Sequence, residues 1–223
     1  VIRAAAERNL LVIGDVKRGD VGHSAEQYAL AHLTDRIEGN AGRRTAPDAV
    51  TINGYFGLDG VRPFIDAGTR VGGGVFVLVR TSNSSAETIQ DVVARDGRKM
   101  HEIVASLVAE WASDPRTIGR CGYSCVGAVV ASRNPADAAV LRDRMPASIF
   151  LVPGYGAQGG TVDDVRAYFK SDGTGAVVAA GRSVIYAYER TQDGEAGTSD
   201  WRACVEQACN AFVDELRRVA GGP

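Results

Sequence analysis

The sequence predicts an α/β fold, a (β/α)8 TIM barrel with phosphate-binding loops after its last two strands. Short runs of β-branched residues alternate with stretches of helical periodicity along the 223 residues. The runs are almost continuously apolar, as strands of a parallel sheet covered on both faces must be. Unusual polar residues follow the carboxyl ends of these runs, and barrels carry their active sites at that end.

The composition is that of one globular domain, which we expect to span residues 1–223. Hydrophobic residues make up 45% and charged residues 23%, and the net charge is −2. This balance does not indicate binding to nucleic acid or to an anionic membrane surface. The apolar runs are too short to span a bilayer, and the opening residues lack the pattern of a signal peptide. Four cysteines fit no zinc-binding spacing. We therefore expect free thiols and a reducing cytoplasm.

Six strands and six main helices are expected in alternation. The predicted strands are residues 10–16, 48–52, 74–81, 125–131, 148–153 and 176–181. The predicted helices are residues 24–37, 58–67, 99–111, 135–144, 162–169 and 201–219. Residues 1–9 have the pattern of a helix that leads into the first strand. Six strands are two fewer than a barrel needs, so we expect that the first two βα units are absent and that the domain is N-terminally incomplete.

A cluster of charges follows the first predicted strand, within residues 14–24. Asp15 and Lys17 are two residues apart, so on an extended strand end they point to the same side. A carboxylate beside an ammonium keeps both groups ionised and gives a proton donor with a fixed direction. Asp20 adds a second acid, and Ser24 is expected to cap the next helix. The alternative is a surface ion pair at a strand end, which contributes little.

Glycine-rich segments follow the last two predicted strands. Gly154, Gly156 and Gly159 formally match a dinucleotide-binding fingerprint, which is a weak signal this late in a chain. Gly181 and Arg182 follow the next strand. Backbone N–H groups and one guanidinium suit a phosphate monoester, and barrels frequently bind phosphate after strands 7 and 8. The alternative is that these glycines serve only tight turns.

A third polar segment, residues 80–83, ends the strand predicted at 74–81. Its hydroxyls and amide either read the edge of a base or cap the following helix, and the sequence does not decide between the two. The three histidines are scattered and are expected to be structural.

Residues 14–29 resemble the signature of the orotidine 5′-phosphate decarboxylase family, especially its bacterial branch with Asp-x-Lys-Arg-Gly-Asp. Residues 48–57, 81–83, 153–160 and 181–183 are similar to later blocks of that family in the same order. The resemblance implies a cofactor-independent carboxy-lyase that converts orotidine monophosphate (OMP) to uridine monophosphate (UMP) and CO₂. It also implies a homodimer.

The resemblance implies roles for four charged or hydroxyl side chains. Asp15 would lie against the substrate carboxylate, and Lys17 would give its proton to C6 of the pyrimidine. Asp20 would reach across a dimer interface to the partner's site and help to hold Lys17 there, and Ser24 would accompany it.

Five further residues would bind the substrate according to the same resemblance. Ser82 would read the pyrimidine edge, and Pro153 would border the bound nucleotide. Gln158, the backbone at Gly181 and the guanidinium of Arg182 would hold the 5′-phosphate.

The family also has an aspartate after its first strand and a lysine after its second, and neither motif is found in this sequence. Two alternatives therefore stay open. One is a sugar-phosphate decarboxylase or aldolase of the same barrel superfamily that uses Mg²⁺, and the other is a non-catalytic nucleotide-binding remnant.

Overall fold

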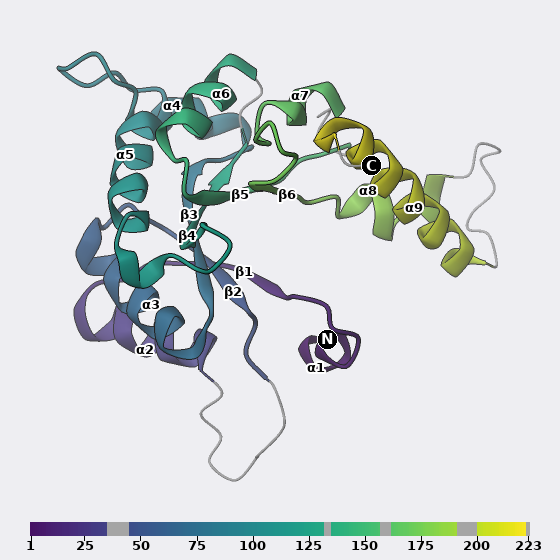
Figure 1. The fold of residues 1–223 in the computed structure, drawn as a ribbon, viewed down its shortest axis with the longest axis horizontal. Coiled ribbons are helices and arrows are strands. Elements are labelled where there is room, and N and C mark those ends of the chain that lie inside the picture. Colours follow the sequence, from purple (N-terminus) through teal and green to yellow (C-terminus); the bar gives the residue numbers. More distant parts are fainter. Residues whose placement is uncertain (35–44, 132–134, 157–161, 191–199, 222–223) are drawn as a thin grey trace, which may run out of the picture.

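A computed structural model describes residues 1–34, 45–131, 135–156, 162–190 and 200–221 (Figure 1). Its six strands are β1 (Ile13–Arg18), β2 (Ala49–Ile52), β3 (Gly74–Arg80), β4 (Ser124–Val130), β5 (Ser148–Val152) and β6 (Ala176–Val178). All neighbouring strands pair in parallel, in the order β1-β2-β3-β4-β5-β6. The sheet curls into half of a barrel, and within the described residues β1 and β6 each pair with one neighbour only. The predicted parallel β/α architecture is confirmed.

The six predicted main helices are present, and two short helices, at residues 87–90 and 182–185, were not predicted. The α-helices are α1 (Ile2–Ala6), α2 (Gly22–Leu33), α3 (Leu58–Val71), α4 (Glu87–Gln90), α5 (Met100–Ala112), α6 (Pro135–Arg144), α7 (Val162–Arg166), α8 (Arg182–Ile185) and α9 (Trp201–Ala220). Short 3₁₀ helices are η1 (Ser84–Ala86), η2 (Pro115–Thr117) and η3 (Ala187–Arg190). Figure 1 shows α2, α3 and α5 along one face of the sheet, while α9 lies beside α7 and α8.

The sheet lies between two apolar layers. Each strand contributes side chains to both layers, because successive side chains of a strand point to opposite faces. On β3, Val75, Val77 and Val79 are buried in the main core, which includes side chains of the surrounding helices. Phe76 and Leu78 point to the inner face of the half-barrel, where they pack with Val129 and other apolar residues. The inner layer forms the floor beneath the polar residues at the carboxyl ends of the strands.

Two elements near the charged segment have boundaries that differ from those predicted. The strand predicted at residues 10–16 runs from Ile13 to Arg18. It begins after Val12 because the N–H of Val12 donates to the Asp48 carboxylate, at 2.7 Å, and not to a backbone carbonyl. The following helix begins at Gly22, with Val21 as its N-cap residue. Ser24 therefore lies in the first turn and does not cap the helix. The predicted end of this helix, residues 35–37, lies outside the described residues.

The four cysteines are free, as the sequence predicts. Across the part of the chain that the structure describes, every helix is too short or too polar to cross a bilayer.

Candidate active site

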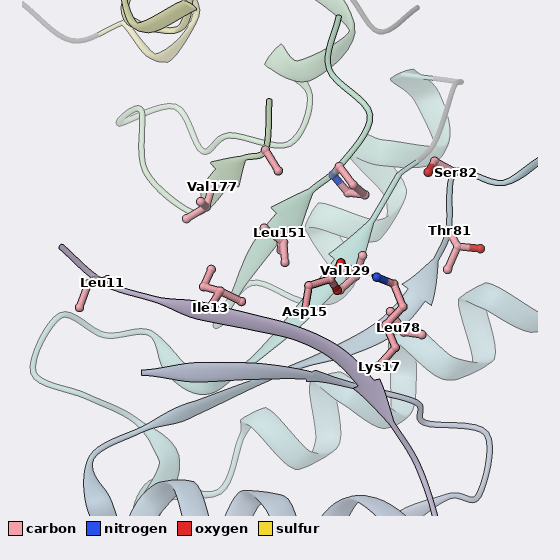
Figure 2. Close-up of a pocket in the computed structure, with 12 residues that line it drawn as sticks. Leu11, Ile13, Asp15, Lys17, Leu78, Thr81, Ser82, Val129, Leu151 and Val177 are labelled. Carbon is pink, nitrogen blue, oxygen red and sulfur yellow. Dashed lines mark hydrogen bonds and ion pairs between the residues drawn. The ribbon is translucent and has the colours of Figure 1, made fainter. Parts of the chain in front are cut away.

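A cavity of about 510 Å³ opens on the inner face of the half-barrel (Figure 2). Its floor is apolar, and among the described residues the polar side chains that line it are Asp15, Lys17, Thr81 and Ser82. Pro153, which follows β5, also borders it. The structure therefore brings together residues from three of the predicted motifs. A volume of this size is typical of sites that bind small molecules.

Asp15 and Lys17 form an ion pair inside this cavity. The Lys17 Nζ lies 2.5 Å from Asp15 Oδ2, and both side chains are more than half exposed. Strand pairing is irregular here. Gly14 pairs with Val50 and Arg18 pairs with Ile52, so β1 has more residues than β2 between these two pairs. Lys17 has φ of 47°, a left-handed conformation that is uncommon for a residue with a Cβ. Backbone strain of this kind persists where the surrounding structure enforces it, and it often marks functional sites.

Thr51 on β2, which is not among the site residues predicted from the sequence, supports the ion pair. Its hydroxyl accepts a hydrogen bond from the backbone N–H of Lys17 and donates one to Asp15 Oδ1, each at 2.9 Å. Thr51 is completely buried. In the sequence it is one β-branched residue in an apolar strand, so only the pairing of β1 with β2 reveals its role.

The electrostatics of the pair keep Asp15 ionised. Burial alone would raise the pKa of Asp15, but hydrogen bonds from Lys17 and Thr51 and the charge of Lys17 outweigh it and lower that pKa below its ordinary value. The carboxylate is therefore charged at neutral pH and holds the ammonium of Lys17 in one direction.

We expect Thr51→Val to lower turnover by about tenfold, because the same-sized side chain removes the hydroxyl that orients both Asp15 and Lys17. Steady-state kinetics and thermal unfolding of the variant provide the test. Thr69→Val is the matched control, since Thr69 on α3 bonds the Ile65 carbonyl and lies outside the cavity. Equal turnover for Thr51→Val and the unaltered chain would contradict this role.

Asp20 and Ser24 do not line this cavity. Asp20 Oδ1 accepts a hydrogen bond from the backbone N–H of Val21 at 2.8 Å. Ser24 is exposed on α2. Both residues follow β1 in the chain, and neither takes part in the ion pair of Asp15 and Lys17.

The two glycine-rich segments meet beyond the carboxyl ends of β5 and β6. Gly154 and Gly156 have φ of 94° and 69°, conformations that glycine adopts without strain. A Cβ on Gly156 would lie 3.1 Å from the Cβ of Ser183, so the two segments are in close contact. Gly181 is the N-cap residue of α8, and the exposed Arg182 begins that helix. Gln158 lies outside the described residues.

The C-terminal helix packs against the first of these segments, a contact that was not predicted from the sequence. The Tyr155 hydroxyl donates a hydrogen bond to Glu215 on α9. The Tyr155 ring also packs on Phe212 of the same helix, with 5.0 Å between ring centroids. Burial and the neighbouring carboxylate raise the pKa of Tyr155, so its hydroxyl stays protonated and remains a donor.

Within the described ranges, no group of three or more His, Cys, Asp or Glu side chains could hold a metal ion.

Comparison with known sequences identifies relatives along most of the chain. The model of the orotidine 5′-phosphate decarboxylase / HUMPS family matches residues 1–196. An orotidine 5′-phosphate decarboxylase of Rhodopirellula baltica is 39% identical over 221 residues, which cover 97% of this chain and 70% of that protein. The Clostridium kluyveri enzyme of the same name is 34% identical over 214 residues, covering 96% of this chain and 69% of that protein.

Solved structures share the fold. A candidate orotidine 5′-phosphate decarboxylase from Streptomyces avermitilis superposes with a TM-score of 0.76 at 26% identity, over 99% of this chain and 69% of that chain. The OMP decarboxylase of Leishmania donovani superposes with a TM-score of 0.66, also at 26% identity, over 93% of this chain and 69% of that chain.

Proposed function

The chain belongs to the orotidine 5′-phosphate decarboxylase / HUMPS family, and on this premise we propose how its residues decarboxylate OMP to UMP and CO₂. The observation that carries the proposal is the ion pair of Asp15 and Lys17, which lies in a cavity at the same end of the sheet as the two glycine-rich segments. An anionic substrate of nucleotide size fits this arrangement, with its base near Lys17 and its phosphate near Arg182.

Lys17 stabilises the charge that develops in the reaction. When the bond between C6 and the carboxylate breaks, CO₂ leaves and the electron pair stays on C6. The Lys17 ammonium, held by Asp15, stabilises this pair without reorganisation of solvent and then transfers a proton to C6. Solvent returns a proton to Lys17, so the atoms and charges balance.

Asp15 acts on the bound substrate. Its lowered pKa keeps a negative charge beside the substrate carboxylate, which disfavours the ground state relative to the transition state, where the carboxylate has lost its charge. A lysine in this position supplies the cation that a Mg²⁺-dependent relative would take from its metal. We therefore expect decarboxylation to survive treatment with EDTA.

Binding groups surround this centre. Ser82 reads the pyrimidine edge, and Pro153 borders the nucleotide. Gln158, Gly181 and Arg182 hold the 5′-phosphate, with backbone N–H groups and a guanidinium that suit a phosphate monoester. Energy from phosphate binding orders these segments around the base, which raises turnover as well as affinity.

The functional unit is a homodimer in which Asp20 and Ser24 enter the partner's site. Within one chain, the Asp20 carboxylate bonds the backbone N–H of Val21, whereas Lys17 pairs with Asp15, although Asp20 is only three residues from Lys17. Apolar side chains are exposed near Asp20. Val21, the next residue, is 50% exposed, and Tyr55 and Phe56, which follow the neighbouring strand β2, are 80% and 46% exposed. Such a patch beside a charged group fits an interface between copies of the chain.

Active-site complementation tests this sharing of residues. We expect Lys17→Ala and Asp20→Ala each to be inactive alone, and their co-expression to restore about a quarter of normal activity, since half of the dimers are hybrids with one intact site. Hybrid dimers without activity would contradict the shared site. A wholly monomeric protein on sedimentation would contradict the dimer itself.

The reaction places this protein in pyrimidine biosynthesis, as the step that forms UMP, and the four free cysteines support a cytoplasmic location. Loss of OMP, followed by ultraviolet absorbance with and without EDTA, tests the function. Binding of UMP without loss of OMP would point instead to the non-catalytic alternative.

A further inference from the structure

We infer that Gln90 is a positioning residue that fixes the segment after β3 and thereby directs Ser82 toward the pyrimidine. The inference rests on the proposed function, in which Ser82 reads the base. Thr81 and Ser82 leave the sheet at the end of β3 and line the cavity near Lys17 (Figure 2). Beyond β3 the chain has no strand ladder to hold it, so its direction depends on side-chain contacts.

Gln90 holds Thr81 at two points. The backbone N–H of Thr81 donates to Gln90 Oε1 at 3.0 Å, and Gln90 Nε2 donates to the Thr81 hydroxyl at 2.7 Å. The backbone N–H can only donate, so the amide oxygen must face it, and this fixes the orientation of the Gln90 amide. The Thr81 hydroxyl then donates to Asn83 Oδ1 at 2.6 Å. The residues on both sides of Ser82 are therefore tied in place.

Gln90 is itself anchored from β3. Arg80 donates to Gln90 Oε1 and to Asp91 Oδ2, each at 3.1 Å. The guanidinium side chain is only 11% exposed, so water competes little for these bonds. The amide of Gln90 consequently has a fixed place beside the strand that delivers Ser82.

A buried histidine anchors the backbone of the same residue. His101 on α5 is 2% exposed, and its Nδ1 lies 2.9 Å from the carbonyl oxygen of Gln90 and 3.2 Å from Asp91 Oδ1. A carbonyl oxygen can only accept, so Nδ1 must carry a proton. The end of α4 is thus joined to both β3 and α5, which makes Gln90 a rigid support.

Gln90→Met tests this role, because methionine has nearly the same length but forms neither hydrogen bond. We expect the affinity for UMP to fall, and the KM for OMP to rise, by about tenfold, because Ser82 loses its fixed direction. The affinity for ribose 5-phosphate, which lacks the base, should change less than about twofold if the phosphate site is untouched. Gln90→Glu keeps the acceptor for Thr81 but loses the Nε2 donor, so its affinity for UMP should be intermediate.

Gln207→Met on the exposed surface of α9 is the matched control and should bind both ligands as the unaltered chain does. Calorimetric titration of each variant with UMP and with ribose 5-phosphate gives the comparison. Equal losses for the two ligands in Gln90→Met would indicate general loosening of the fold and would overturn the inference, as would unchanged binding of UMP. If the unaltered chain failed to bind UMP, the proposed function would fail and the inference with it.

Discussion

Lys17→Ala should abolish decarboxylation of OMP, with a loss of turnover of roughly 10⁴-fold or more, while UMP still binds. The variant removes both the cation that stabilises the electron pair on C6 and the proton that C6 receives. Alanine carries the same Cβ as lysine, so it meets the same left-handed backbone at position 17 and adds no new strain. Single-turnover measurements of OMP loss and a titration with UMP separate turnover from binding.

Lys17→Arg distinguishes charge from proton transfer. Arginine keeps a positive charge near Asp15, but its guanidinium holds its protons too tightly to transfer one at neutral pH. We expect this variant to remain strongly impaired. Near-normal turnover in Lys17→Ala would remove Lys17 from the mechanism.

Arg182→Ala should raise the KM for OMP by about a hundredfold, because a charge-assisted contact to the phosphate is lost. Turnover should fall as well, since energy from phosphate binding helps to order the site. The exposed Arg166 on α7 provides a matched control, and Arg166→Ala should leave both constants unchanged.

Orotidine, which lacks the 5′-phosphate of OMP, tests whether Arg182 acts through the phosphate. If the guanidinium contacts the phosphate, Arg182→Ala should slow the reaction of orotidine far less than that of OMP. An unchanged KM for OMP, or equal effects on the two substrates, would refute the phosphate site at Arg182.

The strands and their direction were predictable because the pattern that encodes them is simple. A run such as residues 74–80 is apolar at almost every position, and the structure shows why, since Val75 and Val77 face the helices while Phe76 and Leu78 face the inner layer. Parallel pairing then brings the polar residues that follow each strand to one edge. That Asp15 and Ser82 lie in one cavity could therefore be predicted from the sequence.

Details that depend on contacts between distant parts of the chain could not be predicted from the sequence. Lys17 adopts a left-handed conformation, whereas the residue type most often found there is glycine. Thr51 lies 34 residues from Lys17 and contacts it only because β1 pairs with β2. Gln90 likewise lies between two predicted elements with no pattern that marks it, and only its contacts with Thr81 and Arg80 distinguish it.

Ser24 shows how a local rule can mislead. A serine before an apolar helical stretch commonly caps the helix, but here the helix already begins at Gly22, whose φ is 54°. The glycine at this position lets the chain turn directly from the segment around Asp20 into α2, which leaves Ser24 exposed on the first turn.

A crystal structure of this chain with UMP would test most directly whether one site spans Lys17 and Arg182. We expect C6 of the pyrimidine to face Lys17 Nζ and the 5′-phosphate to lie against Gly181 and Arg182. A nucleotide bound with its phosphate on Lys17, or bound outside the cavity, would show that no such site exists.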